Sequence, residues 1–119
     1  MATVPTHVLN SVDGTHAGGL PVMLSRIETG GARRELLAGS TDDGGRFASE
    51  VDLNGAAPNA EYELVVETGD YFAGRGQGDP GRQISKCVVV RFTMADPETR
   101  YHIPMMLAPH SHSVWTSQG

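Results

Sequence analysis

The chain has 119 residues, a net charge of −5 at pH 7 and one lysine, Lys86. This length predicts a single domain, residues 1–119, with one hydrophobic core and little room for a second. Because binding to phosphate groups calls for clustered lysine and arginine side chains, the acidic balance and the scattered arginines argue against nucleic acid or an anionic membrane as a partner.

The sole cysteine is Cys87, so an internal disulfide is impossible, which fits a cytoplasmic setting. Residues 1–5 do not begin a secretory leader, and no apolar stretch approaches the roughly 20 residues that span a bilayer. We therefore expect a soluble cytoplasmic protein. Because Cys87 opens a run of valines, we expect it to be a buried small apolar residue rather than a nucleophile.

The first half of the chain predicts four short strands joined by turns. Alternating apolar and polar side chains mark them at 6–10, 20–27, 33–40 and 46–53. In the second of these strands, Leu20, Val22 and Leu24 lie on one face. Residues 41–45 predict a tight turn, because glycine adopts positive φ at little cost and aspartate tolerates it.

The second half predicts strands at 62–67 and 84–94, a final strand pair within 101–119, and a possible short helix at 69–76. The intervening segments 54–60 and 77–82 are expected to be loops. In the final pair, the residues on one face are Tyr101, Ile103, Met105 and Leu107, and those on the other are His102, Pro104 and Met106. Seven or eight short strands with one short helix predict an all-β fold, an antiparallel β-sandwich.

Two histidines within apolar strands, His7 and His102, stand near opposite ends of the sequence. A lone histidine on a strand is more often structural than catalytic. An arginine after a glycine pair, such as Arg46, is most often a solvated charge. These residue types alone therefore do not assign a function.

Five separate motifs, in this order, resemble those of transthyretin-related proteins, and most of all those of the 5-hydroxyisourate hydrolase branch. They are Thr6-His7-Val8-Leu9, Thr41 to Gly45-Arg46, Tyr62-Glu63-Leu64, Gly69-Asp70-Tyr71-Phe72 and Tyr101-His102-Ile103-Pro104. The resemblance extends from Thr6 to Ser113, which is nearly the whole chain.

The resemblance implies a transthyretin-like sandwich assembled as a homotetramer, a dimer of dimers, with active sites in a channel between the dimers. It implies hydrolysis of a small heterocyclic substrate, 5-hydroxyisourate, in urate breakdown. By position, His7, Arg46 and His102 match the catalytic residues of the family. We expect no cofactor and no metal. Met105 and Met106 place apolar side chains on both faces of one strand, as expected where one face meets the core and the other a partner subunit.

Opening a lactam-like ring needs an activated water molecule and a place for negative charge on the carbonyl oxygen. A neutral histidine, with an ordinary pKa near ~6.5, can accept the proton from water, and either His7 or His102 fits this role. The other histidine can hold the water or protonate the departing nitrogen. Arg46 stays charged and offers a planar fork of donors that can bind and polarise the substrate.

The C-terminal segment departs from the hydrolase pattern, which ends in Tyr-Arg-Gly-Ser. Here the matching residues are Trp115-Thr116-Ser117-Gln118, so the aromatic residue is kept in kind and the arginine and terminal serine are replaced. We expect the tail to contact the substrate through His110, His112, Ser113, Trp115, Thr116 and Ser117. One of the hydroxyls of Ser113, Thr116 or Ser117 can replace the missing serine, and Trp115 is expected to pack at a subunit contact.

Three histidines stand where the family usually carries other residues. His110 and His112 replace residues that are more often aromatic, and His16 replaces a proline. His110 and His112, two apart on a strand, also suit a zinc site together with His102, but no cysteine or carboxylate lies near them in the sequence. Two alternatives to the hydrolase function stay open: a divergent enzyme on the same scaffold that acts on a different heterocycle, and a non-catalytic protein that binds a small molecule.

Overall fold

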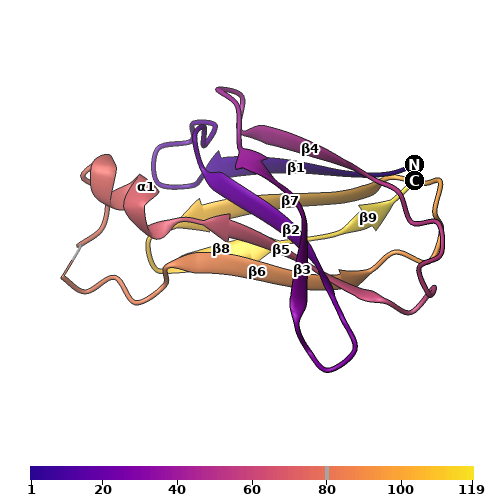
Figure 1. Ribbon diagram of the computed structural model, residues 1–119. Helices are drawn as coiled ribbons and strands as arrows, with labels where there is room; N and C mark the ends of the chain where they lie inside the picture. Colours follow the sequence, from indigo (N-terminus) through magenta and orange to yellow (C-terminus); the bar gives the residue numbers. More distant parts are fainter. Residues whose placement is uncertain (80) are drawn as a thin grey trace.

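Two β-sheets face each other in the computed structural model, which describes residues 1–79 and 81–119 (Figure 1). The elements are β1 (Ala2–Asn10), β2 (Pro21–Ile27), β3 (Arg33–Ser40), β4 (Arg46–Val51), β5 (Glu61–Glu67), α1 (Gly69–Gly74), β6 (Cys87–Thr93), β7 (Tyr101–Ala108), β8 (Ser111–Val114) and β9 (Ser117–Gln118). Helix α1 lies at one end of the sandwich, and both chain termini lie at the other. No helix among the described residues has the length and apolar character needed to cross a bilayer.

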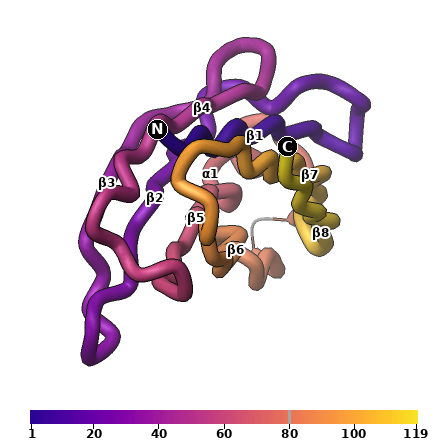
Figure 2. The backbone as a smooth tube through the Cα atoms, turned by 90° about the vertical axis from the view of Figure 1, so that its right-hand side faces the viewer, coloured from indigo at the N-terminus to yellow at the C-terminus, as the bar shows by residue number. Residues whose placement is uncertain are grey.

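The first sheet has the strand order β4-β1-β7-β8, with β9 paired to β7, and the second has the order β3-β2-β5-β6. Figure 2 shows the two layers from the end at which the termini lie. The predicted antiparallel sandwich is confirmed. Among the strand pairs that the structure describes, β1 and β7 alone run parallel.

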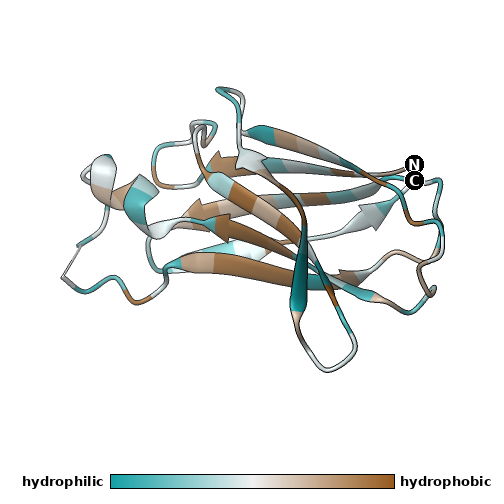
Figure 3. Ribbon diagram, viewed as in Figure 1, coloured by the Kyte–Doolittle hydropathy of each residue, from teal (hydrophilic) through white to brown (hydrophobic). Residues whose placement is uncertain are grey.

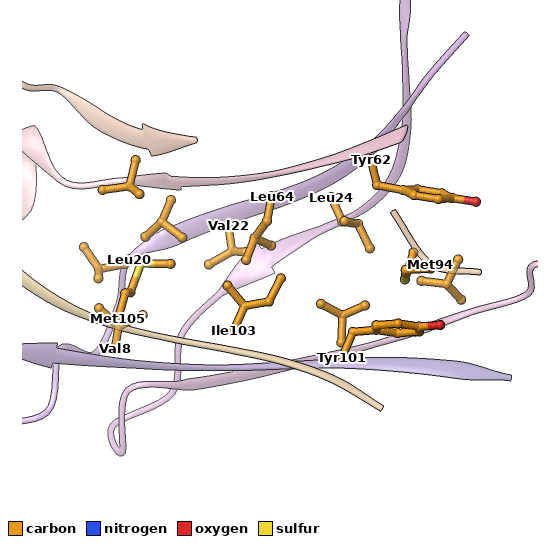
Figure 4. Packing of buried hydrophobic residues seen from close by; sticks show 14 of the residues in the cluster. Val8, Leu20, Val22, Leu24, Tyr62, Leu64, Met94, Tyr101, Ile103 and Met105 are labelled. Atoms are coloured by element: carbon orange, nitrogen blue, oxygen red, sulfur yellow. The ribbon is translucent and has the colours of Figure 1, made fainter. Parts of the chain in front are cut away.

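The core lies between the sheets, as alternation of side chains requires. Figure 4 shows Val22, Leu24 and Leu64 of the second sheet pointing toward Ile103 and Met105 of the first. The predicted inner faces are confirmed, because all of their side chains are buried: Leu20, Val22 and Leu24, and Tyr101, Ile103, Met105 and Leu107. Figure 3 shows the same pattern as apolar segments along the strands.

Strand β1 begins at Ala2, four residues before its predicted start at Thr6. Pro5 has no amide hydrogen to donate to a ladder. In the structure, Pro5 lies opposite Ala48 of β4, and the parallel ladder to β7 begins only at Thr6. The buried side chains of Ala2 and Val4 explain why the strand extends to the start of the chain.

Strand β6 begins at Cys87, not at Ile84 as predicted. Ile84 is 90% exposed, and the carbonyl oxygen of Lys86 accepts hydrogen bonds from the amides of Thr68 and Gly69 at the start of α1. Lys86 therefore bonds to the start of α1, and the sheet begins only at Cys87. Cys87 is only half-buried, so the prediction that it is buried is wrong. The helix at Gly69–Gly74 is confirmed; the predicted loop 77–82 includes residue 80, which lies outside the described residues.

Candidate active site

The three residues proposed from the sequence lie on the outer face of the first sheet, on three adjacent strands. His7 of β1 is directly opposite Arg46 of β4 in the antiparallel ladder. On its other side, His7 is opposite Pro104 of β7 in the parallel ladder, so His102 lies two residues along the same face. Directly opposed residues have Cβ atoms about 5 Å apart, so the sheet register brings the three polar side chains together.

The turn before β4 sets the position of Arg46. The carboxylate of Asp42 accepts hydrogen bonds from the amides of Gly44 and Arg46, both at 2.9 Å. Gly45 has φ 73°, and a Cβ atom there would lie 2.4 Å from the carbonyl oxygen of Val8. Only glycine therefore allows this turn to pack directly against β1, where the carbonyl oxygen of Gly45 accepts from the amide of Val8 at 2.8 Å.

Arg46 is exposed, and it takes part in none of the ion pairs found among residues 1–79 and 81–119. Its guanidinium turns back over the β3–β4 turn, since a Cβ atom at Gly44 would lie 3.1 Å from its Nη1 atom. A charged, planar group of donors without a carboxylate partner can bind a substrate carbonyl or a developing anion.

The imidazole of His7 is half-buried, and its surroundings favour the neutral form. Burial lowers its pKa from the ordinary 6.5, and the positive charge of Arg46 and the nearby rings of His16 and His102 lower it further. A backbone hydrogen bond with Gly44 opposes this shift only in part. A neutral imidazole beside an unpaired arginine is suited to hold or deprotonate water near neutral pH.

Sequence reasoning gave no role to His16, which the structure places directly against His7. Nδ1 of His16 lies 2.9 Å from Nε2 of His7, and the two rings stack with centroids 5.0 Å apart. The signal in the sequence is the Asp13-Gly14 turn. If the segments on either side of this turn are paired as a hairpin, the chain reverses after Asn10 and His16 lies opposite Leu9, as it does in the structure.

Two of the tail residues share the outer face with His102. Ser113 of β8 is opposite Met106, and Ser117 of β9 is opposite His102 itself. The backbone amide of Trp115 donates to the carbonyl oxygen of Pro104 at 3.3 Å, and its side chain is half exposed. The tail therefore runs along β7 beside the histidines.

The strand pairings do not place the other tail residues beside His7. His112 is opposite Leu107, so it points to the other side of the sheet and borders a groove with Val89 of β6. Thr116 borders a hollow between the sheets, and His110 is exposed at the β7–β8 turn. Within the described part of the chain, no three His, Cys, Asp or Glu side chains are arranged to hold a metal ion.

Similarity to known proteins extends over almost the entire chain. A family model described as the HIUase/transthyretin family matches residues 4–117. The chain is 34% identical over 110 residues to 5-hydroxyisourate hydrolase 2 of Rhizobium meliloti (strain 1021), covering 92% of this chain and 91% of the relative.

Solved structures give the same result. The structure of Klebsiella pneumoniae 5-hydroxyisourate hydrolase is similar with a TM-score of 0.75 and 29% identity, over 98% of this chain and 99% of that one. Transthyretin from Sparus aurata is similar with a TM-score of 0.81 over 98% of this chain and 97% of that one. At 20% identity, this last similarity concerns the fold alone.

Proposed function

Because the chain belongs to the HIUase/transthyretin family, we propose that it is a hydrolase that opens the ring of 5-hydroxyisourate, a step of urate breakdown. The observation that carries this proposal is the alignment of His7, Arg46 and His102 on neighbouring strands of one exposed sheet face. Within the part of the chain that the structure describes, an imidazole without a side-chain hydrogen bond and an unpaired guanidinium supply a proton acceptor and a site for negative charge. A protein that only binds a small molecule needs no such base.

His7 and His102 differ in whether their ring nitrogens already form side-chain hydrogen bonds. Nε2 of His7 is engaged with His16, whereas none of the side-chain hydrogen bonds found among the described residues involves His102. We therefore assign to His102 the removal of a proton from water, and to His7 a neutral ring that borders the bound substrate. Arg46 then stabilises the negative charge that develops on the carbonyl oxygen as the ring nitrogen departs.

We further propose that the active protein is a homotetramer, a dimer of dimers, in the cytoplasm. Met106 is 41% exposed on the same face as His102, and Trp115, whose backbone runs beside Pro104, is 50% exposed. Large apolar side chains next to a polar site are expected where a second subunit covers the face. Sedimentation velocity measures the assembly, and Trp115→Ser should weaken it if the tryptophan lies at the contact.

A second candidate is a hydrolase of a different heterocycle. The feature that favours it is the tail, in which Ser117 of this chain lies opposite His102 while the arginine of the hydrolase ending is absent. A site built to hydrogen-bond one ligand rejects analogues that leave its polar groups unpaired. Deleting residues 115–119 should then change which substrates are accepted. Unchanged kinetics after this deletion would remove the tail from substrate selection.

The direct test uses 5-hydroxyisourate made freshly from urate with urate oxidase. We expect the protein to accelerate the decay of its ultraviolet absorbance well beyond the spontaneous rate, and His102→Ala to remove that acceleration. Thr29→Ala, an exposed change in the β2–β3 turn, is the control for handling and folding. A well-folded protein that leaves the spontaneous rate unchanged would overturn the assignment and favour the second candidate or a binding protein.

A further inference from the structure

His16 lies against His7, yet the division of roles proposed above leaves it without one. A nitrogen-to-nitrogen distance of 2.9 Å requires one proton between Nε2 of His7 and Nδ1 of His16. The two rings lie nearly parallel, with an interplanar angle of 18°. This contact restricts the orientation of the His7 side chain.

The backbone sets this arrangement. His16 forms an antiparallel bridge with Leu9. The amide of Ala17 donates to the carbonyl oxygen of Val8 at 3.0 Å, and the amide of Asn10 donates to the carbonyl oxygen of Thr15 at 2.8 Å. Because His7 and Leu9 share the outer face of β1, the ring of His16 lies on that face too. The β1–β2 loop therefore pairs briefly with β1, and this pairing places His16 next to His7.

The same loop is fastened from the side of α1. The carboxylate of Asp13 accepts hydrogen bonds from Thr15 Oγ1 at 2.6 Å, Arg75 Nη2 at 2.6 Å and Gln77 Nε2 at 3.0 Å. These bonds hold the pKa of Asp13 well below its ordinary value. The carboxylate thus stays charged near neutral pH, and its hydrogen bonds hold the loop that carries His16 in place.

The groups that face His7 are Arg46 from β4, His102 from β7 and His16 from the β1–β2 loop. None of them is a carboxylate that could stabilise an imidazolium at His7. The exposed ring of His16 can donate from Nδ1 to Nε2 of His7, which leaves the half-buried ring of His7 neutral. Protonation of both rings would place two cations at hydrogen-bond distance beside Arg46.

We propose that His16 is a positioning residue, which fixes the orientation of the His7 imidazole and keeps a second proton off its Nε2 atom. The protonation of His7 then depends on its contact with His16. The consequence for catalysis rests on the proposed function, in which His7 must be neutral. The contact itself does not rest on that function, since it is a property of the free protein.

The first measurement is a titration of the histidine ring signals by NMR in the absence of substrate. It compares the wild type with His16→Ala, His16→Asn and Val12→Ala, an exposed change in the same loop that serves as the matched control. We expect the pKa of His7 to rise in His16→Ala, because one of the causes that lower it is removed. His16→Asn keeps a short donor and should give an intermediate result; Val12→Ala should match the wild type.

The second measurement is the pH profile of kcat/KM for hydrolysis. In His16→Ala, the acidic limb should move to higher pH, and the plateau should fall roughly tenfold to hundredfold because His7 is no longer held in place. His16→Asn should recover part of this loss, and the melting temperature should stay near that of the wild type. A purely structural role would change melting without moving the pH profile.

An unchanged His7 titration in His16→Ala would overturn the proposal, whatever substrate the protein uses. A shifted titration with an unshifted pH profile would overturn the positioning role. If the wild type does not hydrolyse 5-hydroxyisourate, the proposed function fails, and the NMR titration alone then decides whether the histidine pair exists.

Discussion

The two outer faces of the sandwich differ in whether their charged side chains form ion pairs. On the second sheet, Glu63 is nearly buried between two arginines: Arg33 Nη2 donates to it at 2.8 Å and Arg91 Nη2 at 2.7 Å. On the first sheet, Arg46 lies beside the imidazoles of His7 and His102, and none of the ion pairs found among residues 1–79 and 81–119 involves Arg46. The charged groups of the second sheet are satisfied within the protein, whereas on the first sheet, within the described part of the chain, the guanidinium of Arg46 has no ion-pair partner and the ring of His102 has no side-chain hydrogen bond.

This difference separates structural polar residues from functional ones. A carboxylate held by two guanidinium groups has its hydrogen-bonding capacity filled and gains nothing from a ligand. An arginine without a carboxylate partner beside two imidazoles adds little to the stability of the fold, and it can bind a ligand that carries negative charge. We call the outer face of the first sheet, with His7, Arg46 and His102, the unsatisfied face, and that of the second sheet, with Glu63, the satisfied face. Substitutions on the unsatisfied face should lower activity, and substitutions on the satisfied face should lower stability.

The largest effect is expected from removing the histidines of the unsatisfied face. His102→Ala should lower kcat/KM by roughly 10²–10⁴-fold, the usual contribution of a positioned base. The double variant His7→Ala with His102→Ala should lose little more, because the effects of groups that act on one bound substrate are not additive. Parallel thermal melts should show a change in the free energy of unfolding below about 0.5 kcal/mol. Two independent, additive losses would mean that the histidines do not act together.

Arg46 should give the next largest effect. Arg46→Ala is expected to reduce kcat by roughly 10²–10³-fold, because it removes donors that meet the developing negative charge. Arg46→Lys keeps the charge but loses the planar fork, so it should fall between Ala and the wild type. Steady-state kinetics of the three proteins measures this order. Equal activity of all three would show that the absence of a carboxylate partner at Arg46 has no catalytic meaning.

Gly45 links backbone geometry to the unsatisfied face. Gly45→Ala should destabilise the fold by about 1–3 kcal/mol, because positive φ is strained for alanine. The new Cβ atom would also press on the carbonyl oxygen of Val8 and on Cβ of His16, 3.4 Å away, so activity should fall as well. Gly55→Ala is the matched control, since it has φ 80° and open space around its Cβ position. Denaturant unfolding and the decay assay together should show that Gly55→Ala lowers the stability of the fold and leaves the activity unchanged.

Much of the fold followed from local pattern. Strand β3 was predicted at the residues where it occurs, and alternation identified the buried faces of β2 and β7. Where prediction erred, the cause was a competing contact. The burial of Ala2 and Val4 extends β1 to the start of the chain, and the bonding of Lys86 to α1 shortens β6. The parallel pairing of β1 with β7 joins residues almost a whole chain apart, and no local pattern encodes it.

The candidate site was only partly predictable for the same reason. His7, Arg46 and His102 were proposed from family motifs, and the sheet register that unites them came from the structure. His16 was noticed only as an unusual residue, because its significance depends on the exact return of the β1–β2 loop. The charge state of the groups around His7 likewise depends on burial and neighbours, which spacing in the sequence does not reveal.

The smallest effect is expected on the satisfied face, and it should depend on pH. Its two arginines lower the pKa of Glu63 from the ordinary 4.5 to about 2. As the pH falls, the unfolded chain takes up this proton first, so the stabilisation by ionised Glu63 is full above pH 4.5 and is lost as the pH falls toward 2. Glu63→Gln should therefore lower the melting temperature by a few degrees near neutral pH, and its difference from the wild type should shrink through that window.

Activity per folded molecule should be unchanged in Glu63→Gln, because the satisfied face lies on the opposite side of the sandwich from His102. Thermal melts at a series of pH values, with the decay assay at neutral pH, test both parts of this prediction. A stability difference that stays constant down to pH 2 would show that the carboxylate charge is not what stabilises the cluster. A loss of turnover at full folding would mean that the two faces communicate, and satisfied polar groups would then no longer mark a purely structural face.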